Sequence, residues 1–195
     1  MSIDEETIAV YESRSHEYAA RTGQRAEPGL AEFVARLPAG GHVLDLGCGP
    51  GDAAQRFLKA GFKVDAVDAT PAMVARAREL GVAARQARFD EIEGQGLYDG
   101  IWASYSLLHA PRADMPGILA RLHRALKPGG WVHIGLKLGT GELRDRLGRL
   151  YVYYTEAELT GLLEAAGFTP TARATRLDTG LDGTEYQGIW IHAHG

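Results

Sequence analysis

Short apolar segments alternate with segments of helical periodicity along most of the chain. The apolar segments are bounded by turn residues and predict strands over 42–46, 62–67, 82–89, 98–105, 131–137, 168–176 and 186–194. The segments between them repeat apolar residues every three or four positions, and they predict helices over 52–61, 70–81, 114–130 and 155–167. Most of the chain is therefore expected to consist of alternating strands and helices.

Start and stop signals support two of these helices. Thr70 and Pro71 suit the cap and the first position of a helix that Gly81 ends. Thr155 and Glu158 form a capping box before an apolar face.

This alternation predicts an α/β fold with a doubly wound, Rossmann-like sheet of seven mostly parallel strands and helices on both faces. The last two strands follow each other directly, so we expect an antiparallel addition at one edge. Ligands of such sheets bind at the carboxyl ends of the strands. The segments expected around one crevice are 45–51, Asp68, 98–109 and 136–141.

Composition is that of an ordinary globular protein, with 45% hydrophobic and 24% charged residues in 195. We expect a single domain over 1–195, with a helical cap (1–40), a cofactor-binding core (41–137) and a substrate-side loop, helix and strand pair (138–195). A net charge of −4 argues against nucleic acid as a partner. One cysteine, no signal core and no apolar run of membrane length favour a cytoplasmic protein without a membrane partner. For the oligomeric state, the sequence is compatible with a monomer and with a homodimer.

Candidate chemistry starts with "VLDLGCGPGD" (43–52), where glycines follow the first predicted strand. A dinucleotide pyrophosphate requires free N–H groups and no nearby carboxylate, but Asp45 and Asp52 flank this loop and Pro50 removes one N–H. The spacing is G-x-G-x-G, and no Gly-Lys-Ser/Thr of a P-loop follows. An acid-flanked loop suits a cationic ligand that carries an adenosine, and S-adenosylmethionine fits best.

The first motif, "VLDLGCGPG", resembles that of class I S-adenosylmethionine-dependent methyltransferases. The resemblance continues in order through "VDAVDATPAM" (64–73), "FDEI" (89–92), "YDGIWASYSLLH" (98–109) and "LHRALKPGGWVHI" (122–134). It covers nearly the whole chain from about Tyr11. The stretches "IWASYSLLHAPRADMPGILARLHRALKPGGWVHIGLK", "GELRD" and "YYTEAEL" further resemble small methyltransferases of a tellurite-resistance-like group.

The resemblance implies S-adenosylmethionine as cofactor, with S-adenosylhomocysteine as product, and a set of residues that bind it. Asp45 would orient the glycine loop and help hold the ammonium, and Asp68 would accept both ribose hydroxyls unless it only caps a helix. Asp90 would accept from the adenine amine, although a surface acid is the alternative. Tyr18 would cover the cofactor or pack in the core. The loop and the remaining walls would consist of Gly47, Cys48, Gly49, Gly51, Ala69, Met73, Phe89, Ala103 and Ser104.

Methyl transfer needs alignment and exclusion of water more than it needs side-chain chemistry. His109 is the candidate general base, and a wall residue is the alternative reading. The acceptor pocket would be rimmed by Tyr105, His109, Lys137, Arg144, Tyr153 and Tyr154, with Glu142 nearby, unless these charges belong to a solvated loop. We expect the glycine-rich loop after the fifth strand to close over a small acceptor with an acidic or polar handle. His192 and His194 have no companion ligands, so no metal is expected.

Three functions fit these observations. A methyltransferase acting on a small molecule is favoured. A protein or nucleic-acid methyltransferase would need a motif at the fourth strand that is absent here, and a recognition domain. A non-catalytic or regulatory protein that binds S-adenosylmethionine stays open, because a fold does not prove turnover.

Overall fold

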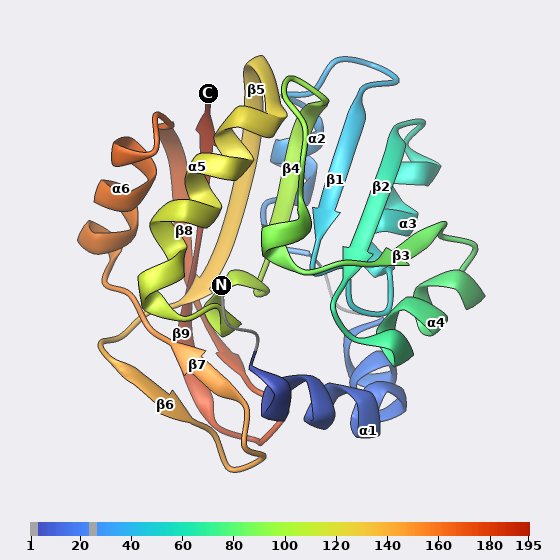
Figure 1. Ribbon diagram of the computed structural model, residues 1–195, viewed down its shortest axis with the longest axis vertical. Helices are drawn as coiled ribbons and strands as arrows, with labels where there is room; N and C mark the ends of the chain where they lie inside the picture. The colour runs from blue at the N-terminus through green and yellow to red at the C-terminus, as the bar shows by residue number, and fades with distance from the viewer. Residues whose placement is uncertain (1–3, 24–26) are drawn as a thin grey trace.

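A central sheet of seven strands organises the computed structural model, which describes residues 4–23 and 27–195. The strand order is β3-β2-β1-β4-β5-β9-β8, and the first five strands of this order run parallel (Figure 1). The β9 strand pairs antiparallel with both β5 and β8. The predicted doubly wound sheet with an antiparallel C-terminal addition is confirmed.

The strands are β1 (His42–Leu46), β2 (Lys63–Asp68), β3 (Ala84–Gln86), β4 (Tyr98–Ser104), β5 (Leu126–Lys137), β6 (Glu142–Arg144), β7 (Leu150–Val152), β8 (Thr169–Thr179) and β9 (Glu185–His194). The helices are α1 (Glu5–Thr22), α2 (Leu30–Val34), α3 (Asp52–Lys59), α4 (Pro71–Glu79), α5 (Met115–Ala125) and α6 (Glu156–Ala165), with short 3₁₀ turns at Phe89–Glu91, Leu107–His109 and Arg112–Asp114.

Both helix signals are found in the structure. Thr155 caps α6, and its side chain accepts from the Glu158 amide while the Glu158 carboxylate accepts from the Thr155 amide. Pro71 opens α4 after Thr70, although the Thr70 side chain makes no capping bond.

Three expectations about the elements were wrong. The third strand is only Ala84–Gln86, because it pairs along one edge with β2 alone. The fifth strand begins at Leu126 rather than at 131, across an irregularity in its pairing with β4. The segment after β5, which we expected to be a loop, contains the two-stranded β6–β7 sheet.

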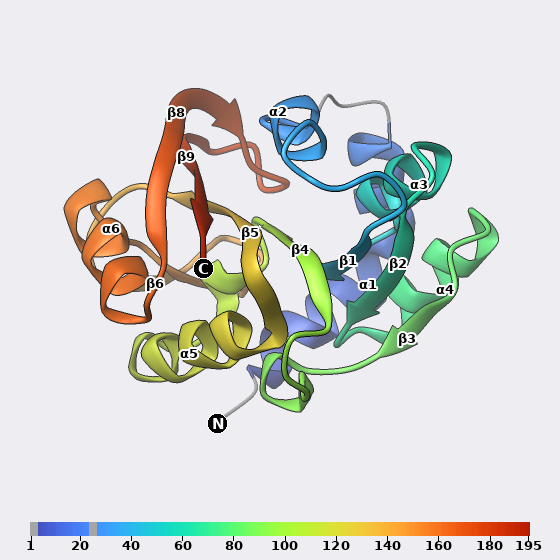
Figure 2. The ribbon, with the colours of Figure 1, turned by 90° about the horizontal axis from the view of Figure 1, so that it is seen from above.

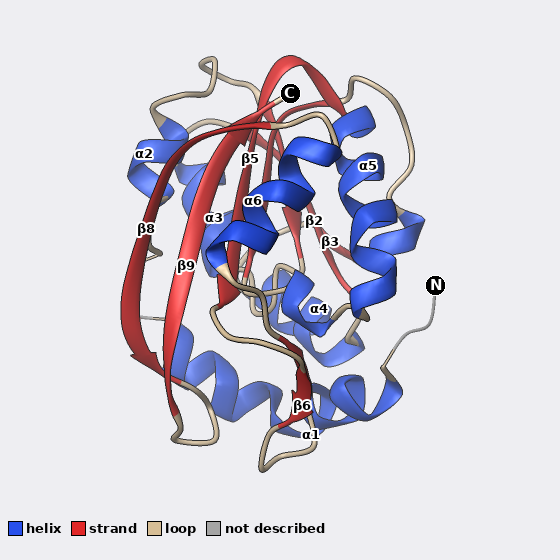
Figure 3. Cartoon of the chain, turned by 90° about the vertical axis from the view of Figure 1, so that its left-hand side faces the viewer, coloured by secondary structure: helices blue, strands red, loops and turns tan. Residues whose placement is uncertain are grey.

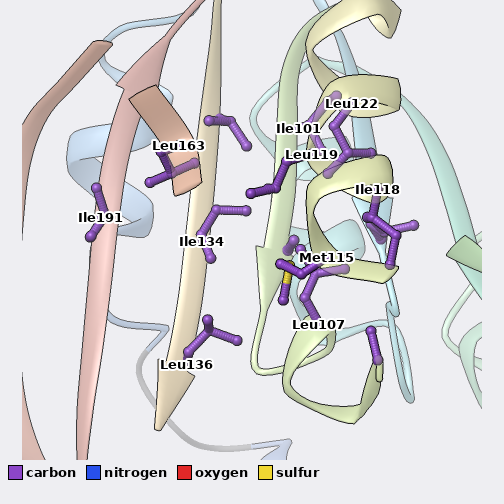
Figure 4. Packing of buried hydrophobic residues seen from close by; sticks show 14 of the residues in the cluster. Ile101, Leu107, Met115, Ile118, Leu119, Leu122, Ile134, Leu136, Leu163 and Ile191 are labelled. Atoms are coloured by element: carbon purple, nitrogen blue, oxygen red, sulfur yellow. The ribbon is translucent and has the colours of Figure 1, made fainter. Parts of the chain in front are cut away.

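Helices cover both faces of the sheet (Figure 2). On one face α5 and α6 bury a large apolar cluster against β4, β5 and β9, in which Leu119, Ile134 and Leu163 are fully buried (Figure 4). On the other face Phe33 of α2 and Phe57 of α3 pack with Trp102. These clusters bury β1, β4 and β5 on both sides, which fixes where their carboxyl ends lie.

The α1 helix lies across the carboxyl ends of the parallel strands, with the β6–β7 sheet beside it (Figures 1 and 3). Hydrogen bonds tie the two together. The Thr7 hydroxyl accepts from the Leu150 amide at 2.8 Å, and Arg144 is paired with Asp4. The crevice at the strand ends is therefore covered by two segments that lie far apart in the sequence.

Candidate functional site

Two adjoining cavities lie in the crevice at the carboxyl ends of the strands. They share walls formed by Tyr11, Tyr18, Gly47, Gly49, Ser104 and Tyr105. The first cavity extends toward the ends of β2 and β3, and the second extends toward β5, β7 and the β8–β9 turn. Both cavities thus open at the edge of the sheet where the sequence predicts ligand binding.

The glycine loop after β1 forms the common border of the two cavities. Gly47 has a positive φ of 75°, and a Cβ there would lie 2.3 Å from the Ser106 Cβ, so only glycine fits. Gly49 also has a positive φ, of 53°, and a Cβ there would point toward open space and Tyr18. These two glycines bring backbone to the border of both cavities, where the sequence predicts a ligand.

Gly51 lies outside both cavities. A Cβ at this position would lie 2.9 Å from the Ala77 Cβ of α4. Gly51 therefore allows close packing between the loop and α4, and its place in the cofactor site stays a prediction.

Asp45 is a buried carboxylate at the base of the second cavity. Asp45 is 2% exposed, and its Oδ2 has no hydrogen-bond partner among the described residues. Burial raises the pKa of Asp45 well above its usual value, and the nearby acid Glu27 raises it further. Glu27 and Asp52 line the same cavity, and burial raises the pKa of each. Arg56 carries the opposite charge near Glu27 and Asp52, and it partly offsets the rise in the pKa of each.

Asp68 ends β2 and holds the loop while it faces the first cavity. Its Oδ2 accepts from the Gly49 amide at 2.9 Å, and its Oδ1 accepts from the Thr70 amide at 2.8 Å. Burial raises the pKa of Asp68, and these two hydrogen bonds oppose the shift. Each carboxylate oxygen keeps further lone pairs for a ligand.

The rest of the first cavity contains most of the residues predicted around the adenosine. Ala69, Met73, Phe89 and Asp90 all line it. The Asp90 carboxylate is also paired with Arg88 at 2.6 Å. Ser104 lines both cavities, whereas Ala103 is buried behind it and lines neither.

Both nitrogens of the His109 ring are occupied. Nδ1 lies 2.6 Å from the Leu150 carbonyl, so Nδ1 carries the hydrogen, and Nε2 accepts from the Tyr11 hydroxyl at 2.9 Å. Burial lowers the pKa of His109 to about 4. His109 lines the first cavity, and this geometry favours a wall residue over a general base.

The second cavity has a basic and aromatic wall opposite Asp45. Lys137, at the end of β5, contributes to it together with Arg149, Arg176, Tyr151 and Tyr186. Arg149 is 1% exposed, and it is held by Asp145 at 2.6 Å while it donates to the Tyr11 hydroxyl at 3.0 Å. The cavity is therefore lined by acids near the glycine loop and mainly by cations on this wall, where Asp178 is paired with Arg176.

Three predicted acceptor residues lie outside both cavities. Arg144 is exposed on β6 and pairs with Asp4 and Glu6. Tyr154 is buried beneath Arg112, and the Tyr153 carbonyl accepts from the same guanidinium. Of the predicted acceptor wall, the structure keeps Tyr105, His109 and Lys137 at the crevice.

Several wall residues were not predicted, because they belong to segments without a motif. Tyr11 and Arg21 come from α1, Glu27 precedes α2, and Arg149 precedes β7. The sequence offers one weak indication of them, which is that tyrosines and arginines recur in the N-terminal segment and in 141–154. Position along the sequence could not show that α1 and the β6–β7 sheet meet.

Neither a metal centre nor a membrane-spanning helix is found within residues 4–23 and 27–195. These residues contain no group of three or more histidine, cysteine, aspartate or glutamate side chains placed to hold a metal ion. Across the same part of the chain, no helix has the length and the apolar character needed to cross a bilayer.

Comparison with known proteins matches the fold. A family model described as a methyltransferase domain matches residues 18–172. The carboxy-S-adenosyl-L-methionine synthase of Chromohalobacter salexigens is 32% identical over 150 residues, which are 70% of this chain and 55% of that protein. The trans-aconitate 2-methyltransferase of Delftia acidovorans is 31% identical over 172 residues, which are 83% of this chain and 59% of that protein. The chain thus spans a little over half the length of these curated relatives.

A solved structure extends the match over the full chain. The 1,6-didemethyltoxoflavin-N1-methyltransferase of Burkholderia thailandensis, with 1,6-didemethyltoxoflavin and S-adenosylhomocysteine bound, aligns with a TM-score of 0.75 at 28% identity. The alignment covers 100% of this chain and 91% of that one. The chain therefore belongs to the family of proteins built on this methyltransferase domain.

Proposed function

We propose that the protein binds S-adenosylmethionine and transfers its methyl group to a small-molecule acceptor. The observation that carries this proposal is the unpartnered Oδ2 of buried Asp45 beside the glycine loop. A buried carboxylate oxygen without a partner is costly, and a cationic group of a ligand would compensate it. A dinucleotide would bring phosphate charge to a loop flanked by acids, which is unfavourable.

The residues present fit this cofactor. Asp45 and Glu27 would hold its ammonium, and Asp68 would accept from the ribose hydroxyls. Ala69, Met73, Phe89 and Asp90 would surround the adenine, as their place in the first cavity suggests. Arg21 donates to the Leu181 carbonyl and is available to a carboxylate at the mouth of the second cavity.

The bound sulfonium supplies an electrophilic methyl group, so this chain's residues act by position. Gly47 and Gly49 would bring backbone against the ligand, and Tyr11 and Tyr18 of α1 would shield the junction of the two cavities from water. The acidic side of the second cavity would take the methionine part of the cofactor, and the side lined by Lys137 and Arg149 would hold the acceptor. We do not assign His109 the role of proton acceptor, because its Nε2 already accepts a hydrogen bond from the Tyr11 hydroxyl.

The relatives support a small acceptor. Matched proteins are described as acting on trans-aconitate, on a ubiquinone precursor and on 1,6-didemethyltoxoflavin. Membership of the tellurite-resistance-like group stays a prediction, as do the single domain over 1–195, the cytoplasmic location and the monomer or homodimer. The non-catalytic alternative is separated from the proposal only by turnover.

Calorimetric titration with S-adenosylhomocysteine and with NAD tests the cofactor proposal directly. We expect S-adenosylhomocysteine to bind and NAD to bind far more weakly. Asp45→Asn keeps the shape of the side chain but removes its charge. It should weaken S-adenosylhomocysteine binding by about 1.5–3 kcal/mol, the range for hydrogen bonds to charged groups.

The same variant should raise the melting temperature of the ligand-free protein, because it removes an unpaired buried charge. Tight binding of NAD with none of S-adenosylhomocysteine would refute the proposal. Mass spectrometry with labelled S-adenosylmethionine and a panel of small acceptors would then distinguish an enzyme from a binding protein.

A further inference from the structure

Lys137 places a cation against two aromatic rings in the second cavity. Its Nζ lies 3.8 Å from the ring centroid of Tyr151 and 4.2 Å from that of Tyr186. The residue is only 7% exposed. The faces of these two rings favour the ammonium, but they supply no counter-charge.

Lys137 is set apart from the other cations of this wall by the absence of a paired acid. Arg149 pairs with Asp145, and Arg176 pairs with Asp178. Among the described residues, no carboxylate lies within ion-pair distance of the Lys137 Nζ. The charged groups that face it at longer range are Arg149, Asp145, Asp178 and Asp182.

Burial, and after it the charge of Arg149, lower the pKa of Lys137 to about 8, while the three acids oppose the shift. A partly desolvated ammonium without a partner is unfavourable. An anion bound at Nζ would relieve this cost and would raise the pKa again.

The shape of the cavity restricts what such an anion can be. The rings of Tyr11, Tyr105, Tyr151, Tyr186 and Trp102 line the same space as Lys137. Among the described residues, Tyr105 alone is a non-glycine residue with a positive φ, of 53°. Its hydroxyl oxygen lies 2.1 Å from the point that a Cβ on Gly188 would occupy. The backbone at the end of β4 thus accepts an uncommon conformation that places an aromatic ring at the junction of the two cavities.

We propose that the second cavity takes a planar, conjugated anion, with its negative group on the Lys137 Nζ and its ring against the surrounding tyrosines. Flat rings gain stacking contacts from aromatic walls that a puckered ring cannot make. This rests on the proposed function, since the anion is the acceptor that would lie beside the methyl group.

Simple aromatic acids test this proposal without knowledge of the acceptor. The protein, saturated with S-adenosylhomocysteine, is titrated calorimetrically with benzoate, with its neutral counterpart benzamide and with the puckered anion cyclohexanecarboxylate. We expect benzoate to bind about tenfold tighter than either of the others, which corresponds to about 1.4 kcal/mol. At pH 8, benzoate binding should also take up protons, measured by repeating the titration in buffers of different ionisation enthalpy.

Three variants separate the role of Lys137 from general effects. Lys137→Met should remove both the preference for benzoate over benzamide and the proton uptake. Lys137→Arg should keep the preference and lose the proton uptake, because an arginine stays charged at pH 8. Lys127→Met, which removes an exposed lysine paired with Asp99, should change neither.

Equal affinity for the three probes would overturn the proposal, as would no binding at millimolar concentration or a preference that survives in Lys137→Met. Binding of S-adenosylhomocysteine in the same samples is the separate readout. If it is lost, the proposed function fails. If it persists while benzoate is not preferred, only the assignment of the second cavity fails.

Discussion

The two walls of the second cavity are built in different ways. The acidic wall consists of Asp45, Asp52 and the loop between them, all within one strand-to-helix turn, with Glu27 added from before α2. The basic wall takes Lys137, Arg149 and Arg176 from three separate segments, and each arginine is paired with an acid close to it in the sequence. The charge of the acidic wall can be changed within one turn. On the basic wall, Arg149 also donates to the Tyr11 hydroxyl of α1, so changing it disturbs a contact between two segments.

Replacing Arg149 should therefore have the largest effect, and it should act on folding. Arg149→Met leaves the Asp145 carboxylate, which is 6% exposed, without its ion-pair partner, and it removes the guanidinium that donates to the Tyr11 hydroxyl. Breaking a buried pair costs on the order of 3–5 kcal/mol. The free energy of unfolding, measured by denaturant titration, should fall by about this amount.

The double variant Arg149→Met with Asp145→Asn provides the control, since it removes both charges and keeps a side-chain oxygen that can accept from the amides of residues 147 and 149. It should recover much of the lost stability, because no buried charge remains. A single variant as stable as the parent would show that the basic wall is not structural, and the contrast between the walls would disappear.

Asp68→Ala should have a smaller effect, and it should act mainly on binding. The change removes the acceptor of the Gly49 and Thr70 amides and the expected acceptor of the ribose hydroxyls. Affinity for S-adenosylhomocysteine should fall by about 1.5–3 kcal/mol in calorimetry. Asp68→Asn, which keeps one acceptor oxygen, should lose less. Unchanged affinity together with a sharply lower melting temperature would make Asp68 a purely structural acid.

Arg144→Ala should have the smallest effect, although the residue lies close to Arg149 along the chain. Its guanidinium is exposed, so solvent reaches both of its ion pairs from the arginine side, although the Asp4 side chain is only 13% exposed. Exposed ion pairs contribute little to stability. Melting temperature and S-adenosylhomocysteine affinity should both stay near those of the parent. A large loss of affinity would restore Arg144 to the site.

The same contrast explains which parts of the site could be predicted. Gly47, Asp45 and Asp68 lie at strand ends, so local periodicity alone places them at the carboxyl edge of the sheet. Arg149 and Tyr11 become neighbours only because α1 crosses that edge and meets the β6–β7 sheet. No hydrophobic period or helix cap in the sequence indicates that contact. Arg144 and Tyr154 share the segment of Arg149 and Tyr151, and strand alternation there, over three residues, was too short to tell inward from outward.

The attachment of α1 sets how fast a ligand can exchange. Only Thr7 and Ser15 are buried among the described residues of α1. Polar contacts hold the helix in place, such as the hydrogen bond that the Glu12 carboxylate accepts from the Ala72 amide. A segment with so little apolar burial opens at a lower free-energy cost than the sheet beneath it. Since α1 contributes Tyr11 and Tyr18 to both cavities, its opening would expose them together. We therefore expect residence times of bound molecules to follow the opening rate of α1, and its amides to exchange hydrogen faster than those of β4.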